Sequence, residues 1–208
     1  TFSNDSWKST VMWTSNARDL SCVLINPNKP AQVFAGAWGA GVYVFENGQL
    51  TNNYNETNSS LQSIFPGQDY IRIGGLLLDA SQNLYVTNVG VGSPISVKTP
   101  GDEWYSYNYP ELAGQGDVAA IIETIYGHKW VQVARNGGLF AFDDNRTLAN
   151  IDDDLRKRFS IYDETGQFVT NEVFSLAEDH DGVIWVGTDM GVLRSEEHTS
   201  ELQSPTTI

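Results

Sequence analysis

The chain reads Val173-Phe-Ser-Leu-Ala-Glu-Asp-His-Asp-Gly-Val-Ile-Trp-Val-Gly-Thr-Asp-Met-Gly-Val-Leu193 near its C-terminal end. This stretch contains a strand, a polar turn, a second strand with an aromatic residue, a short loop and a third strand. Three divergent copies precede it. The second-strand aromatic residues of the four copies are Phe34, Tyr85, Trp130 and Trp185, with spacings of 51, 45 and 55 residues. Because short strands at such periods are typical of propeller blades, the sequence predicts an all-β partial β-propeller of four-stranded antiparallel blades.

The repeats predict about three complete blades and part of a fourth, at residues 21–62, 71–110, 118–163 and 171–193. Inner strands read as apolar runs, so we expect them to be buried on both faces. In the third blade, we expect Phe159 to Tyr162 to form the outer strand. The preceding segment, residues 143–158, is expected to be an insertion with one helical turn. Residues 1–20 would be the end of a preceding blade or a linker.

The C-terminal tail breaks the repeat pattern. Arg194-Ser-Glu-Glu-His-Thr-Ser-Glu-Leu-Gln-Ser204 matches the translation of a common sequencing-library adapter. We therefore expect residues 194–208 to be an artefact and give them no functional weight. The chain also begins in mid-pattern without an initiator Met, so we expect a fragment of a longer protein.

The composition bounds the class of partner. A formal net charge of −14 argues against nucleic acid, which needs a clustered basic face. The basic cluster Arg156-Lys157-Arg158 follows three aspartates and is interpreted as a solvated turn. No run of 18 apolar residues occurs, so we expect no membrane span in this part of the chain. Cys22 is the single cysteine and is expected to be a small core residue.

No residue pattern indicates a nucleophile, a cofactor or a metal, so the catalytic, cofactor and metal sites are all predicted to be absent. Gly36 to Gly41 is glycine-rich, but a strand follows it, which favours a tight loop over a phosphate site. His128 and His180 are placed at equivalent positions of a turn, where a structural role is favoured over metal binding. Paired carboxylates for glycoside hydrolysis stay open, because their spacing is spatial.

Two further patterns leave alternatives open. Asp143-Asp144-Asn145 and Asp152-Asp153-Asp154 offer oxygen ligands for Ca²⁺ but lack the alternating order of a calcium loop. Tyr105, Tyr107 and Tyr109 share one face of a predicted outer strand. That row is either a platform for a sugar or packing between blades, and packing is favoured.

The residues Asn171 to Val192 resemble the two-component-regulator propeller repeat, found in sensors and surface proteins of Bacteroidetes-type bacteria. The wider chain is similar to a family of cell-surface propellers of the type IX secretion system. The supporting stretches include Asn26-Pro-Asn-Lys-Pro30, Val33 to Val42, Asn52 to Leu61, Ile73 to Asp79, Asn83 to Asn88 and Gly127 to Val131. The resemblance implies a non-catalytic role, in which such proteins bind anionic lipopolysaccharide and assist the sortase that anchors cargo.

The loops between second and third strands emerge on the same face as the loops between blades. They carry Trp38, Asn88, Arg135 and Asp189, which we predict to ring one mouth of the central channel as ligand-binding candidates. Arg135 would supply the cation for an anionic sugar. The alternative is that all four are ordinary turn residues.

Together these patterns predict an extracytoplasmic binding propeller of type IX secretion, with surface glycan, lipopolysaccharide and secretion-complex proteins as partners. The alternative is the periplasmic oligosaccharide-sensing propeller of a hybrid two-component regulator. A propeller glycosidase or lyase is a third class, without a motif to support it.

Overall fold

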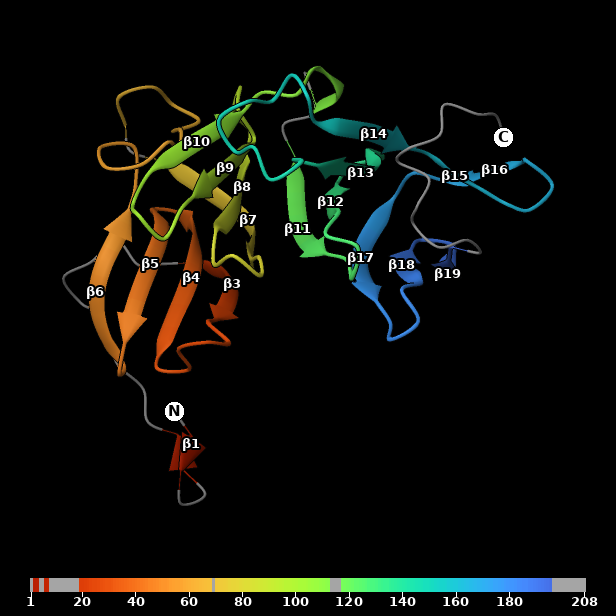
Figure 1. The fold of residues 1–208 in the computed structure, drawn as a ribbon. Coiled ribbons are helices and arrows are strands. Elements are labelled where there is room, and N and C mark those ends of the chain that lie inside the picture. The colour runs from red at the N-terminus through yellow and green to blue at the C-terminus, as the bar shows by residue number, and fades with distance from the viewer. Residues whose placement is uncertain (1, 4–5, 8–18, 69, 113–116, 196–208) are drawn as a thin grey trace.

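A computed structural model describes residues 2–3, 6–7, 19–68, 70–112 and 117–195. Most of the predicted N-terminal segment and residues 196–208 of the predicted artefact lie outside the described residues. The described N-terminal pairs form β1 (Phe2–Ser3) and β2 (Ser6–Trp7), which project below the rest in Figure 1. Among the described residues, no helix is long and apolar enough to cross a membrane.

The strands form successive antiparallel blades, arranged in an arc (Figure 1). Blade 1 contains β3 (Leu20–Ile25), β4 (Gln32–Gly39), β5 (Gly41–Glu46) and β6 (Gln49–Tyr54). Blade 2 contains β7 (Ile71–Leu78), β8 (Leu84–Val89), β9 (Ile95–Lys98) and β10 (Trp104–Tyr107), followed by the 3-10 helix η1 (Pro110–Leu112). Blade 3 contains β11 (Val118–Glu123), β12 (Lys129–Val133), β13 (Gly138–Asp143) and β14 (Leu155–Phe159). The fourth, partial blade contains β17 (Val173–Glu178), β18 (Ile184–Thr188) and β19 (Gly191–Arg194). This arrangement confirms the predicted all-β partial propeller.

A side-chain turn after the inner strand recurs from blade to blade. The Oδ1 atom of Asp79 accepts from the backbone N–H of Asn83 at 2.7 Å, and that of Asp179 accepts from Val183 at 3.1 Å. In blade 3, Thr124 Oγ1 accepts from the N–H of His128 at 3.2 Å. Such turns reverse the chain locally and so set the register of the hairpin.

The same register corrects the predicted equivalence of the two histidines. His128 corresponds to Val183, because Glu123 pairs with Lys129 just as Glu178 pairs with Ile184. His180 lies three residues earlier in its turn and is exposed, whereas His128 is buried.

The outer part of blade 3 also differs from the prediction. The outer strand is β14, which pairs with β13 along its whole length, so the predicted strand at Phe159 to Tyr162 is wrong. Residues 144–154 form turns and no helix. After β14, the chain makes a separate hairpin of β15 (Ile161–Tyr162) and β16 (Phe168–Thr170) before the fourth blade. The run Leu155-Arg-Lys-Arg158 reads as polar, which hid a half-buried strand.

Burial is greatest in the second strands, not in the inner ones. Every residue of β8 and β12 is buried, whereas β3 alternates between exposed and half-buried residues. A second strand has neighbouring strands on both edges. Of the inner strands, β7 also has two neighbours, whereas β3, β11 and β17 are edge strands, and β3 and β17 are the least covered. The predicted burial of inner strands on both faces is therefore wrong. Cys22 does pack against the core between blades 1 and 2, and burial raises the pKa of its thiol.

Two different junctions join the first three blades. Between blades 1 and 2, β4 pairs directly with β7 through Trp38 opposite Arg72 and Gly39 opposite Ile71, which makes one continuous sheet. Between blades 2 and 3 lies an aromatic core that contains Tyr85, Tyr107, Tyr109, Phe140 and Phe142. Tyr107 and Tyr109 are each 1% exposed, so the tyrosine row packs between blades as favoured and offers no platform for a sugar.

Candidate functional site

The four predicted ligand-binding residues all follow or end a second strand, but they differ in exposure. Trp38, near the end of β4, is 38% exposed, and Asp189 is also exposed. Asn88 in β8 is completely buried. No hydrogen bond or ion pair among the described residues joins Arg135 or Asp189 to Trp38 or Asn88. Trp38 and Asn88 therefore both contact Arg72 of β7, one by strand pairing and the other by a hydrogen bond. Arg135 and Asp189 lie on the third and fourth blades.

The burial of Asn88 corrects its predicted presentation at the channel mouth. Its Oδ1 accepts from the backbone N–H of Gln62 at 2.6 Å, and its Nδ2 donates to the carbonyl of Arg72 at 3.2 Å. The Asn88 amide therefore links the loop between blades 1 and 2 to β7. Its oxygen and its nitrogen both have hydrogen-bond partners within the protein.

Arg135 and Asp189 each have a partner within the protein. Arg135 lies in a turn with φ of 55°, and its Nε is 3.0 Å from Asp117 Oδ2. Asp189 accepts from the hydroxyl of Thr170 at 2.7 Å. The Asp117 carboxylate compensates the charge of Arg135, which weakens the predicted role of Arg135 as the cation for an anionic sugar.

A different cation stands at the junction of blades 1 and 2. Arg72 is half-buried at the start of β7, with its Cζ 5.3 Å from the ring centroid of Trp38 and 5.1 Å from that of Tyr70. Contacts of this length between a guanidinium and an aromatic ring are attractive. Sequence reasoning missed Arg72, although a lone cation in the apolar run Tyr70-Ile-Arg-Ile73 is an unusual feature of an inner strand.

A shallow depression of about 400 Å³ lies between the loop that connects blades 1 and 2 and the β8–β9 loop, which begins directly after Val89, the partner of Arg72. Its lining residues are Glu56, Gln62, Ser63, Ile64, Pro66, Gly90, Val91 and Gly92. Tyr70 is joined to the lining, since its N–H donates to Ser63 Oγ at 2.9 Å and its carbonyl accepts from Ile64 at 3.0 Å. Trp38, Tyr70, Arg72 and this depression are called the loop face below.

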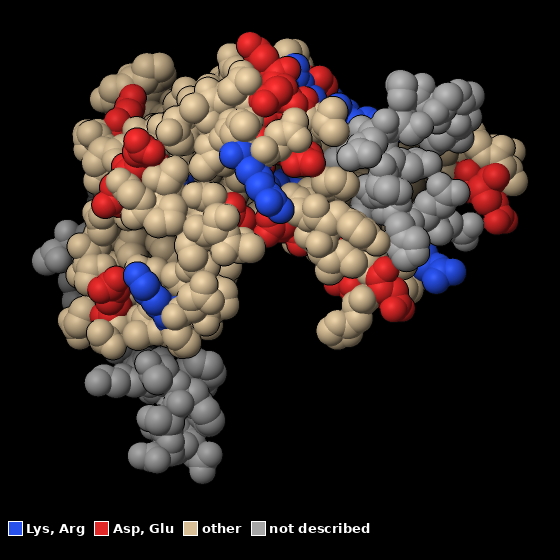
Figure 2. All heavy atoms as spheres, in the orientation of Figure 1, with Lys and Arg blue, Asp and Glu red and all other residues tan. Residues whose placement is uncertain are grey.

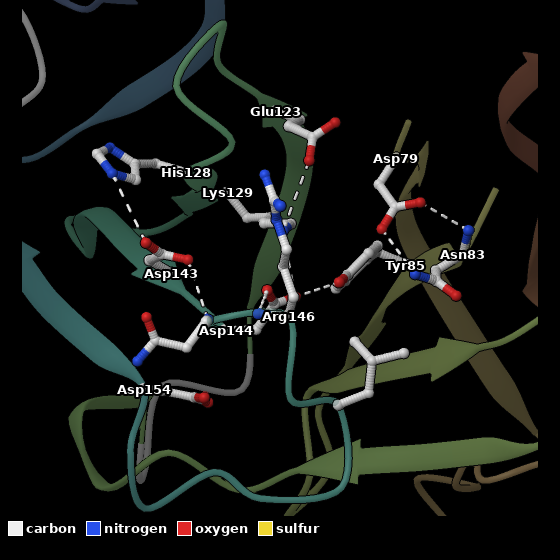
Figure 3. A network of polar contacts seen from close by, with 12 residues as sticks. Asp79, Asn83, Tyr85, Glu123, His128, Lys129, Asp143, Asp144, Arg146 and Asp154 are labelled. Atoms are coloured by element: carbon white, nitrogen blue, oxygen red, sulfur yellow. Dashed lines mark hydrogen bonds and ion pairs between the residues drawn. The ribbon is translucent and has the colours of Figure 1, made fainter. Parts of the chain in front are cut away.

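A second polar cluster lies between blades 2 and 3 (Figure 3). Lys129 is 4% exposed, and its Nζ lies 3.1 Å from Asp144 Oδ2 and 3.5 Å from Glu123 Oε1. Tyr85 of blade 2 donates its hydroxyl to the same Asp144 carboxylate, and the ammonium lies 5.1 Å from the Tyr85 ring centroid. We call Tyr85, Glu123, Lys129 and Asp144 the buried cluster.

The electrostatics of the buried cluster follow from desolvation. Burial, together with the adjacent Asp144 carboxylate, raises the pKa of Tyr85 far above its ordinary value, so the phenol stays neutral. Burial also raises the pKa of Glu123, and Lys129 opposes that rise. These groups resemble an acid–base site chemically. However, Tyr85, Lys129 and Asp144 are each less than 5% exposed, which leaves no access for a substrate.

The acidic loop of residues 143–154 uses its carboxylates for internal hydrogen bonds. Asp154 accepts from the Tyr109 hydroxyl at 2.5 Å, and Asp153 accepts from Thr147 at 3.0 Å. Burial raises the pKa of Asp154, against the effect of the Tyr109 bond. Within the ranges that the structure describes, no three His, Cys, Asp or Glu side chains converge as a metal ion would require.

Figure 2 shows Asp and Glu side chains in separate groups among uncharged residues, with Lys and Arg interspersed. On the side shown, the surface is hollowed between the first and fourth blades. The structure therefore defines a class: a segment of a β-propeller whose strand ends and loops carry aromatic, amide and cationic groups. That class agrees with what comparison with known proteins shows.

Residues 167–190 match the sequence model of the family described as two component regulator propeller. The fold is similar to that of PorZ from Porphyromonas gingivalis, an essential bacterial surface component of the type-IX secretion system. That match has a TM-score of 0.82 and 24% identity, and it covers 90% of this chain and 26% of PorZ. The resemblance to regulator-type repeats and to PorZ is thereby confirmed at the level of repeat and fold. No curated protein matches the sequence.

Two other solved structures widen the comparison. One is the extracellular domain of a protein named as a hybrid two component system from B. thetaiotaomicron, with a TM-score of 0.60, 20% identity, 84% of this chain covered and 21% of that chain. The other is virginiamycin B lyase from Staphylococcus aureus, with a TM-score of 0.57, 12% identity and coverages of 90% and 58%. The chain spans about a quarter of PorZ and a fifth of the regulator domain. Since an enzyme shares this fold, the fold alone does not separate binding from catalysis.

Proposed function

We propose that this chain is part of a non-catalytic binding propeller that acts outside the cytoplasm, as a PorZ-like component of type IX protein secretion and cell-surface attachment. The observation that carries the proposal is the fold similarity to PorZ over 90% of the chain at a TM-score of 0.82. In this function the loop face recognises an anionic glycan such as lipopolysaccharide, or a partner protein.

Two features of the site support binding rather than catalysis. Of the acid–base groups that are close together, Tyr85, Lys129 and Asp144 are enclosed between blades, and Glu123 is half-buried. The accessible groups are instead an aromatic residue, a cation and a shallow depression on the loop face. Concave surfaces with a few convergent polar groups are the usual setting for ligand recognition.

Binding to lipopolysaccharide tests the proposal. The purified 208-residue chain is passed over immobilised lipopolysaccharide that carries an anionic polysaccharide, with a neutral O-polysaccharide as the matched control surface. We expect saturable binding to the anionic surface that weakens as salt is raised. Equal binding to both surfaces, or binding to neither, would contradict recognition of an anionic glycan.

A second candidate function is the oligosaccharide-sensing propeller of a hybrid two-component regulator. It is favoured by the match of residues 167–190 to the regulator propeller family and by the similarity to the B. thetaiotaomicron extracellular domain. The sequence of the intact gene separates the two functions. A β-sandwich sorting domain after further blades supports the secretion component, whereas a transmembrane helix followed by a histidine kinase supports the sensor.

A further inference from the structure

We propose that Arg72, held by Trp38 and Tyr70, is the group that binds an oxyanion of the ligand, a carboxylate or a phosphate carried by a saccharide. This inference rests on the proposed function, and it moves the anion-binding role from Arg135 to Arg72. Three observations carry it: the charge state of the surroundings, the rigidity of the strand, and the position of the depression.

In the part of the chain that the structure describes, the guanidinium of Arg72 has no carboxylate partner, unlike four other cations. Lys98, Lys129, Arg135 and Arg156 each have a carboxylate oxygen at 2.6 to 3.1 Å. Among the described residues none lies within ion-pair distance of Arg72, and its buried Nε has no acceptor there. A guanidinium is a planar fork of donors that matches the geometry of carboxylates and phosphates. In a chain of net charge −14, a guanidinium with an unused buried Nε–H is a favourable place for an anion.

The strand that carries Arg72 is held on both edges. Arg72 pairs with Trp38 of β4 on one side and with Val89 of β8 on the other. The buried Asn88 amide donates to its carbonyl at 3.2 Å. The two aromatic rings then restrict the guanidinium itself. A donor fixed in this way loses little conformational freedom on binding, which favours affinity.

Arg135 offers the opposite case. Its side chain is 81% exposed, lies in a turn with positive φ, and is neutralised by Asp117. A ligand anion at Arg135 would have to displace that carboxylate and would fix an exposed side chain, at an entropic cost. Arg135 is therefore the matched control for Arg72.

The depression gives the saccharide a place next to the cation. Ser63 and Ile64 line it and also bind the backbone of Tyr70, whose ring contacts Arg72. Gln62 and Ser63 supply polar atoms to the lining, Ile64 and Pro66 supply apolar contacts, and Glu56 supplies a carboxylate, which the anionic substituent would have to face away from. A volume of about 400 Å³ lies near the lower end of the range for small-molecule sites, enough for one or two sugar rings. In this arrangement the ring occupies the depression and its anionic substituent points to Arg72.

The test is isothermal titration of the 208-residue chain and its variants at one ionic strength. The probes are trigalacturonic acid, which carries carboxylates, mannose 6-phosphate, and neutral maltotriose. We expect at least one anionic probe to bind. Arg72→Gln should weaken that probe about 10- to 100-fold, because a charge-assisted hydrogen bond is lost. Arg72→Lys should fall in between, and Arg135→Gln should stay within about twofold of the wild type. Which anionic probe binds decides between a carboxylate and a phosphate.

Each other outcome overturns a defined part of this picture. Anionic probes that bind Arg72→Gln as well as the wild type, or that lose more affinity in Arg135→Gln, overturn the role of Arg72 and leave glycan binding intact. Binding of maltotriose alone does the same. If no probe and no lipopolysaccharide binds the wild type, the glycan-binding function itself fails. Thermal unfolding of each variant confirms that the fold is retained.

Discussion

The two junctions between the first three blades solve the same packing problem in opposite ways. At the junction of blades 2 and 3, the loop of residues 143–154 reaches across and buries Asp144 against Lys129 and Tyr85. At the junction of blades 1 and 2, backbone pairing of β4 with β7 makes the connection, and Arg72 has aromatic neighbours but no carboxylate partner among the residues described. Lys129 thus stabilises the fold, while Arg72 can bind a ligand.

The difference teaches where polar groups serve stability and where they are left for a ligand. A buried ammonium without its carboxylate would carry a large desolvation penalty, so the buried cluster depends on all its members. The half-buried Arg72 carries a smaller penalty because solvent and two rings share its charge. Substitutions at matched positions of the two junctions should therefore have very different effects.

Lys129→Met should have the largest effect. It leaves the Asp144 carboxylate buried without its cation, which typically costs about 3–5 kcal/mol when one partner of a buried pair is removed. The free energy of unfolding in urea measures this. The control is the exposed Lys29→Met, expected within about 0.5 kcal/mol of the wild type. If both variants unfold alike, the buried cluster does not stabilise the junction.

Gly74→Ala tests how closely the strands of blades 2 and 3 approach. A Cβ built on Gly74 would lie 2.4 Å from the carbonyl oxygen of Val118 and 2.9 Å from Ala119 Cα, so the backbones would have to separate. Overpacking of this kind costs about 1–3 kcal/mol. Gly92→Ala is the matched control, since its Cβ would meet only the far end of Gln62 at 3.9 Å. A Gly74→Ala variant as stable as Gly92→Ala would mean that the strands of blades 2 and 3 can move apart at little cost in free energy.

The pH dependence of stability reports on Glu123 in the buried cluster. Burial raises its folded-state pKa, so the folded protein holds this proton to higher pH than the unfolded chain does. Its contribution to stability is therefore greatest at low pH, falls as pH rises from the ordinary pKa through the raised one, and is then constant. Unfolding of the wild type and of Glu123→Gln is compared between about pH 4 and 7. The stability difference, wild type minus variant, should decrease with pH, and a flat or rising difference contradicts this.

Arg72→Met should have the smallest effect on stability. Methionine keeps an unbranched apolar stem, and the loss of the contacts with Trp38 and Tyr70 is expected to cost less than about 1 kcal/mol. The same substitution that unfolds the junction at Lys129 is thus tolerated at Arg72. A loss as large as that of Lys129→Met would assign Arg72 to the fold and remove the contrast between the junctions.

Most of the fold could be predicted from the sequence because each blade carries its own signals. Polar turns such as Asp79 to Asn83 close the first hairpin locally, and second-strand aromatics such as Tyr85 and Trp130 mark the period. The outer strand of blade 3 was predicted at the wrong place. Its cationic residues Arg156 and Arg158 reach Glu111 and the carbonyl of Gly137, partners that local patterns do not reveal.

The candidate site was less predictable than the fold. The repeat register placed Arg135 and Asp189 in loops after second strands, as the structure has them, but Trp38 and Asn88 lie within β4 and β8. The register also carried no information on side-chain partners. Asn88 is hydrogen-bonded to the backbone of Gln62 and Arg72, and Arg135 is paired with Asp117, all through contacts between separate segments. Arg72 was missed because its importance comes from Trp38, which is 34 residues away and lies opposite it only once the blades are joined.

The pairing of β4 with β7 has a consequence for how the molecule opens. Because the backbone hydrogen bonds of blades 1 and 2 belong to one sheet, separating these blades requires breaking a ladder as well as a core. Amide protons of the two blades should therefore exchange with deuterium as a single cooperative unit. Blade 3 has its own four-stranded ladder and is held to blade 2 by side chains, so it should open as a second unit with its own rate.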